Sequence, residues 1–91
     1  MMLLRVSSEG DMLTLYREPF ESAEIIRGPY YNKGIRMGTI LVALGLEVPP
    51  GYRSASYYSN YHWVLIMAPD GSVGWVAKGL PDHESYVERV G

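Results

Sequence analysis

A stretch near the middle of the chain, residues 52–63, is rich in side chains that recognise other molecules. It reads Tyr-Arg-Ser-Ala-Ser-Tyr-Tyr-Ser-Asn-Tyr-His-Trp. Tyrosine presents a large rigid ring and a hydroxyl, while serine and asparagine add adaptable hydrogen bonds, a composition typical of recognition loops. We therefore expect Tyr57, Tyr58 and Tyr61 to contact a partner. The alternative is a structural loop whose tyrosines pack back over the protein.

Residues that could carry catalysis or hold a metal are few and scattered. His62 and His83 are the only histidines, and although His83 lies between Asp82 and Glu84, we interpret both as exposed loop residues and not as metal ligands. The chain has no cysteine, which excludes disulfides, thiolate zinc sites and thiol catalysis. Neither a Gly-x-Ser-x-Gly nor a His-Glu-x-x-His arrangement occurs. We expect no enzymatic activity, no metal and no cofactor.

Composition limits the class of protein and of partner. The 91 residues, 47% of them hydrophobic and 20% charged, are enough for one core but not for two, so we expect a single domain over residues 1–91. The net charge of -2 does not favour binding to nucleic acid or to anionic lipid. The apolar run at 1–4 is too short for a signal peptide, and no run approaches the ~20 residues of a membrane span. We expect a cytoplasmic protein.

The elements that must position these side chains are short strands. Ten glycines and six prolines divide the chain into segments rich in β-branched and aromatic residues, which predicts an all-β protein. The clearest signal is a hairpin, because two β-prone runs at 63–68 and 73–77 flank the turn-forming residues Pro69, Asp70 and Gly71.

Other strands are expected where apolar and β-branched runs are bounded by turn residues, at 3–6, 12–16, 39–44 and 85–90. The run at 39–44 is apolar almost throughout, so we expect it to be buried on both faces. Residues 19–28 fit either a helix of two turns or a loop that leads into a short strand at 24–26.

The order of these elements resembles that of the SH3-like barrel, most closely its bacterial class. The resemblance is carried by a Trp that opens a strand, an Asp-Gly turn and a Gly-Trp-Val after it, which here are Trp63, Asp70-Gly71 and Gly74-Trp75-Val76. Residues 13–16 resemble the family's first strand before its RT-type loop, and 85–87 its closing strand. The resemblance covers residues 12–90 and implies a small barrel of about five to seven antiparallel strands with long RT-type and n-Src-type loops.

By this resemblance, Tyr16, Trp63 and Tyr86 line an aromatic groove of the kind that takes up extended or proline-rich peptides. With the loop tyrosines they predict a non-enzymatic module that binds a protein or a peptide, as a small subunit of a larger bacterial or phage assembly. Packing in the core or at a sheet edge is the alternative explanation for each of the three. Nothing in the sequence indicates the oligomeric state.

Charged residues near the expected groove bear on the partner. Glu18, Glu21 and Glu24 would favour a basic peptide, unless they form an ordinary solvated loop. Arg53, amid aromatic residues, supports the alternative function of a small nucleic-acid-binding β-barrel that stacks on single-stranded bases. The segment 46–62 is long for the loop that precedes the Trp strand in the family.

Overall fold

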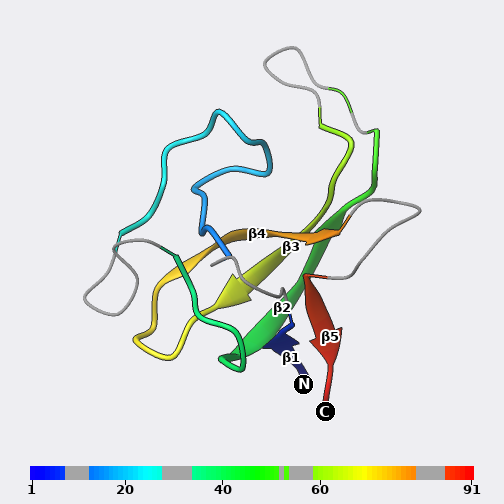
Figure 1. Cartoon of the computed structure of the whole chain (residues 1–91). Helices are drawn as coiled ribbons and strands as arrows, with labels where there is room; N and C mark the ends of the chain where they lie inside the picture. Colours follow the sequence, from blue (N-terminus) through cyan, green and yellow to red (C-terminus); the bar gives the residue numbers. More distant parts are fainter. Residues whose placement is uncertain (8–12, 28–33, 52, 54–58, 80–85) are drawn as a thin grey trace.

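The computed structural model describes residues 1–7, 13–27, 34–51, 53, 59–79 and 86–91. They form one antiparallel sheet of five strands in the order β4-β3-β2-β1-β5 (Figure 1): β1 (Met2–Val6), β2 (Ile40–Val48), β3 (His62–Met67), β4 (Val73–Gly79) and β5 (Val87–Arg89). Among these residues there is no helix, and β4 and β5 are not paired, so the sheet is open. The all-β prediction is confirmed.

The two ends of the chain meet at β1. This strand pairs with the first part of β2 on one side and with β5 on the other. Beyond β5, the Leu3 N–H donates to Gly91 O at 2.9 Å and the Val90 N–H donates to Leu3 O at 3.0 Å, so both termini lie side by side (Figure 1). The strands expected at 3–6 and 85–90 are therefore present, the second one shorter than expected.

The hairpin is formed by β3 and β4, as predicted, with Met67 opposite Val73 nearest the turn. Gly71 has a φ of 89°, a conformation that residues with a Cβ rarely adopt. The Ser72 N–H donates to Asp70 Oδ1 at 3.0 Å, the local bond by which an aspartate favours a turn. The hairpin therefore turns at Asp70 and Gly71, the residues that the sequence predicted for it.

The core lies on one face of the sheet, here called the inner face. It contains side chains from all five strands together with Leu13, Leu15 and Ile35 from outside them. A Cβ on Gly74 would lie 2.8 Å from Leu15 Cδ1 and from the Tyr16 carbonyl oxygen. The chain around Leu15 therefore packs directly against the backbone of β4, and only glycine leaves room for this contact.

Segment 13–27 is neither the strand nor the helix that its sequence allowed. The strand expected at 12–16 is wrong for its described residues, which form only isolated bridges: Leu13 to Ile35, and Tyr16 to both Ile25 and Trp75. A helix at 19–27 is also wrong, since these residues form bends and turns up to the bridge at Ile25. The loop alternative is the one observed, with a single bridge at Ile25 in place of the short strand at 24–26, and the segment is joined to β4 by the bonds between Tyr16 and Trp75.

Burial of the 39–44 strand on both faces is wrong. β2 is longer than expected, and of its residues only Leu41 is fully buried, facing Leu4 of β1. Its neighbour Ile40 is 43% exposed, on the outer face of the sheet, opposite the core. Because β2 extends to Val48 and β3 begins at His62, the loop between them is also shorter than the 46–62 segment expected.

Replacing Ile66 by Ala tests the core assignment. Ile66 is completely buried on the inner face, so its truncation removes apolar contacts and leaves a cavity. We expect the free energy of unfolding to fall by about 2–5 kcal/mol. Urea denaturation measures the change, with Met67→Ala on the outer face of the same strand as the control, for which less than about 1 kcal/mol is expected. Equal effects at the two positions would contradict the register.

Replacing Gly71 by Val tests the turn. Nothing lies within 4 Å of a Cβ at this position, so any loss of stability comes from backbone strain at the positive φ. We expect a loss of about 1–3 kcal/mol. Gly71→Asn is the control, since asparagine tolerates this conformation better than a β-branched residue does. If both variants unfolded at the same urea concentration as the wild type, the strain argument would be wrong.

Candidate functional site

Four aromatic residues from three parts of the chain meet near the first residues of β3. The ring centroids of Tyr16 and Trp63 are 5.5 Å apart with planes at 85°, and those of Tyr61 and Trp63 are 6.0 Å apart at 70°. The rings of Tyr61 and Tyr86 follow at 6.1 Å. The first two contacts are edge-to-face, an arrangement that aromatic pairs favour. We call these four residues the aromatic cluster.

Backbone bonds hold each part of the aromatic cluster in place. Tyr16 and Trp75 exchange two backbone hydrogen bonds, of 2.8 and 2.7 Å, which fix segment 13–27 against β4. The Tyr86 N–H donates to Lys78 O at 2.8 Å, and Tyr86 O accepts from the Ser7 N–H at 2.9 Å. Tyr86 is therefore tied to β4 and to the end of β1 at once.

The hydroxyl of Ser59 joins the aromatic cluster to segment 13–27. It accepts the Trp63 indole N–H at 3.0 Å and the Tyr61 N–H at 3.2 Å, and it donates to Glu21 Oε1 at 2.6 Å. Ser59 is 4% exposed, so the donor and both lone pairs of a buried hydroxyl are all used. Since no lone pair is left to attack a substrate, the geometry assigns Ser59 a structural role.

Burial divides the aromatic cluster into a support and a surface. Trp63 is 1% exposed and is covered by the protein itself, whereas Tyr16, Tyr61 and Tyr86 are half-buried. A partner can therefore reach the three tyrosines but not the tryptophan that supports them. Of the loop tyrosines expected to bind, Tyr61 belongs to this surface, and Tyr57 and Tyr58 lie outside the described residues.

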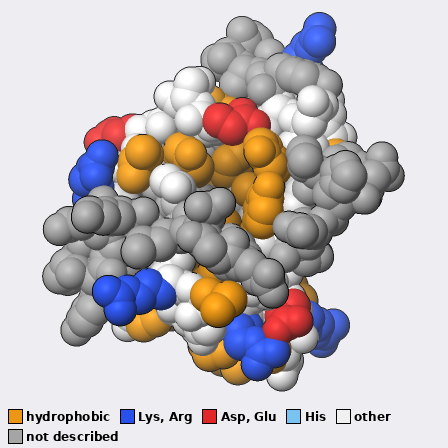
Figure 2. Space-filling view, viewed as in Figure 1, with side chains coloured by type: hydrophobic (Ala, Val, Ile, Leu, Met, Phe, Trp, Pro, Cys, Tyr) orange, Lys and Arg blue, Asp and Glu red, His pale blue; other side chains and the backbone are white. Residues whose placement is uncertain are grey.

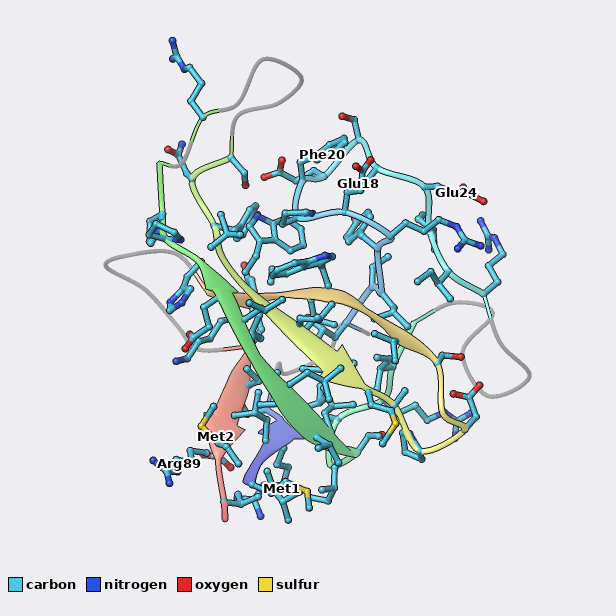
Figure 3. All side chains as sticks on the ribbon, turned by 180° about the vertical axis from the view of Figure 1, so that it is seen from behind. Met1, Met2, Glu18, Phe20, Glu24 and Arg89 are labelled. Atoms are coloured by element: carbon cyan, nitrogen blue, oxygen red, sulfur yellow. The ribbon has the colours of Figure 1, made fainter. Side chains whose placement is uncertain are left out.

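Segment 13–27 carries the three acidic side chains considered in the sequence, and they are not equivalent. Glu21 accepts the Ser59 hydroxyl, and Glu24 forms an ion pair with Arg17 at 3.0 Å. Glu18 is exposed. Figure 3 shows Glu18 and Glu24 on the same segment as Phe20, far from the chain termini, and Figure 2 shows acidic side chains beside a group of hydrophobic ones on one face of the molecule.

His62 is not the exposed loop residue expected. It begins β3, is half-buried, and its Nε2 lies 2.7 Å from Glu47 Oε1. Lys78 Nζ lies 3.7 Å from the same oxygen, so the side chains link the ends of β2, β3 and β4. The part of the chain that the structure describes contains no group of three or more potential metal ligands, and His83 lies outside it.

No protein-family model, curated protein or solved structure matches this chain. The resemblance to SH3-like domains therefore stays a prediction, and any functional conclusion depends on the geometry of the chain itself. No helix in the described parts of the chain is long and apolar enough to cross a membrane.

Sequence reasoning missed the hydrogen bonds by which Ser59 joins Glu21 to Trp63. A signal for Ser59 existed, because a buried indole N–H needs an acceptor and a serine stands four residues before Trp63. No comparable signal pointed to Glu21, since 38 positions separate it from Ser59 and only the fold brings the two side chains together.

Replacing Ser59 by Ala tests the hydroxyl network. The substitution leaves the buried Trp63 indole N–H without the acceptor described above, so we expect a loss of about 1–3 kcal/mol in the free energy of unfolding. Ser72→Ala is the control, because the Ser72 hydroxyl bonds to the Asp70 carboxylate in an exposed turn, at 3.1 Å, and less than about 0.5 kcal/mol is expected. Urea denaturation compares the two variants. A Ser59→Ala protein as stable as Ser72→Ala would show that the network is dispensable.

Proposed function

We propose that this chain is an SH3-like domain of the bacterial type that binds a protein or an extended peptide through its aromatic cluster, without enzymatic activity. The observation that carries the proposal is the convergence of Tyr16, Tyr61 and Tyr86, half-buried, around the fully buried Trp63. We further propose that it acts in the cytoplasm, within a larger assembly, a location with which the absence of cysteine is compatible.

The arrangement of the strands supports the family assignment. A hairpin with Trp63 at the start of one arm and Trp75 in the other follows a long strand, and a short closing strand follows Tyr86. Segment 13–27 is joined to β4 by the bridge between Tyr16 and Trp75, and we assign it as the long RT-type loop. These are the elements on which the sequence resemblance rests.

The spacing of the rings supports an extended ligand. The centroids of two accessible rings in the aromatic cluster, those of Tyr61 and Tyr86, are 6.1 Å apart. In an extended chain, side chains on one face recur every two residues, or roughly 6.6 Å. Alternate side chains of an extended peptide could therefore contact the rings of Tyr61 and Tyr86.

The surroundings of the cluster favour particular residues in the peptide. Rings held by the Ser59 network and by backbone bonds lose little conformational entropy on binding, which makes them suitable anchors for apolar side chains. The exposed carboxylate of Glu18 adds a preference for a basic residue at one end of the peptide.

Selection of peptides followed by substitution of Tyr61 tests the proposal. Peptides would be selected with the wild-type chain from a phage-displayed random library, synthesised, and titrated by NMR. We expect Tyr61→Ala to weaken their binding by about 30-fold, equivalent to about 2 kcal/mol, because an anchor ring is lost. Tyr61→Phe keeps the ring and should bind nearly as well as the wild type.

Controls separate binding from folding. The resonance of the Trp63 indole N–H, bonded to Ser59, reports whether the cluster is intact in each variant. Met67→Ala changes an exposed residue at the far end of β3 and should leave peptide affinity unchanged. Peptides that bind Tyr61→Ala as tightly as the wild type would overturn the proposal. Binding of single-stranded oligonucleotides with a steep salt dependence would favour the nucleic-acid alternative instead.

A further inference from the structure

A row of apolar side chains crosses the outer face of the sheet at the end away from the aromatic cluster. Strands β1 to β4 each supply one residue, and Val90, which directly follows β5, supplies the fifth. Residues that are adjacent in the row lie opposite one another on adjacent strands. In spatial order from β5 to β4 the members of this outer row are Val90, Leu3, Val42, Met67 and Val73.

The outer row is open to solvent. Val90 is 43% exposed, Met67 36% and Val73 48%, and Leu3 and Val42 are half-buried. Exposed apolar residues of β2 continue it along the strand, since Ile40 and Leu44 are 43% and 41% exposed. A contiguous apolar area of this kind marks an interaction surface more often than scattered single residues do.

The composition of β2 and β3 explains why this face lacks cover. Both strands carry large apolar residues on their two faces, a pattern found in strands that are buried on both sides. The core covers the inner face, and the aromatic cluster covers the outer face around Trp63. The half of the outer face that carries Met67 is left exposed.

We propose that the outer row packs against the outer row of a second copy of this chain, in a two-fold symmetric dimer. Two sheet faces pack well on one another at a separation of about 10 Å, with aligned strands and interdigitating side chains. A two-fold interface brings the same surface of both copies together, so the surface must be complementary to itself. An uncharged apolar row fulfils this condition, because apolar residues then meet apolar residues.

The charges beside the outer row are also self-complementary. Arg5 lies opposite Ile40 on β2 and forms an ion pair with Glu88 on β5. Arg5 and Glu88 place one positive and one negative charge beside the outer row, so this pair adds no net charge that would repel a second copy. In the dimer, Arg5 of one copy can approach Glu88 of the other, whereas a strongly charged partner would find no complementary field here.

The size of the surface predicts weak, reversible association. Four strand spacings give a width of about 19 Å, and the length of β2 from Ile40 to Leu46 gives about 20 Å, hence roughly 400 Å² per copy. The total of about 800 Å² is below the ~1,200 Å² of standard stable interfaces and in the range of transient ones. We therefore infer a dimer that forms at high local concentration and that dissociates on dilution.

Sedimentation equilibrium of the full chain between about 10 µM and about 1 mM, the range suited to interfaces of this size, tests the dimer. We expect a reversible increase in dimer with concentration. Met67→Lys places a charge within the symmetric interface and should raise the dimer dissociation constant at least tenfold. Met67→Leu keeps the site apolar, and Ser22→Lys adds the same charge on the exposed part of segment 13–27, so both should dimerise like the wild type.

NMR of the wild-type chain at the same concentrations keeps the test informative if Met67→Lys fails to fold. Concentration-dependent shifts in the outer row, without shifts at Tyr61, support the dimer. A chain that stays monomeric at about 1 mM, or dimers that Met67→Lys does not weaken, would overturn it. So would concentration-dependent shifts confined to the aromatic cluster, which would place the contact at the proposed peptide site instead.

Discussion

β3 carries large apolar side chains on both of its faces, and most of the structure follows from the need to cover them. Val64 and Ile66 point into the core, where β1, β2, β4 and β5 pack with them. Trp63 and Met67 point to the opposite face, which a single open sheet exposes. The chain covers Trp63 with segment 13–27 and the residues before β3, and it leaves Met67 uncovered. One strand thus determines the core, the candidate binding site and the proposed interface between copies.

Burying Trp63 requires a hydrogen-bond acceptor for its indole N–H, and this requirement shapes the candidate site. A buried indole N–H without an acceptor costs free energy, and the Ser59 hydroxyl meets this need. Because the same hydroxyl also bonds Glu21 and the Tyr61 backbone, it fixes two segments that are distant in sequence relative to one another. The half-buried tyrosines around Trp63 are consequently held in place before any partner arrives, which reduces the entropy lost on binding.

Local signals made part of this structure predictable from sequence. The hairpin depends on a turn whose aspartate and glycine act within a few residues of one another, and its prediction is confirmed. Segment 13–27 was not predictable in this way, because Tyr16 pairs with Trp75, 59 positions away in the printed sequence. The exposure of Ile40 was missed for a related reason: an unbroken apolar run shows that both faces could be buried, but not whether the same chain provides the cover.

The two proposed surfaces lie at opposite ends of β3 on one face, so they need not compete. Four residue steps separate Trp63 from Met67, or about 13 Å along a strand. A dimer formed through the outer row would hold two aromatic clusters in a fixed relation to each other. A partner with two suitable peptide segments would then bind the second cluster intramolecularly, at an effective concentration set by the linker between its segments. Weak self-association and weak peptide binding would in this way reinforce one another within an assembly, with neither contact having to be strong alone.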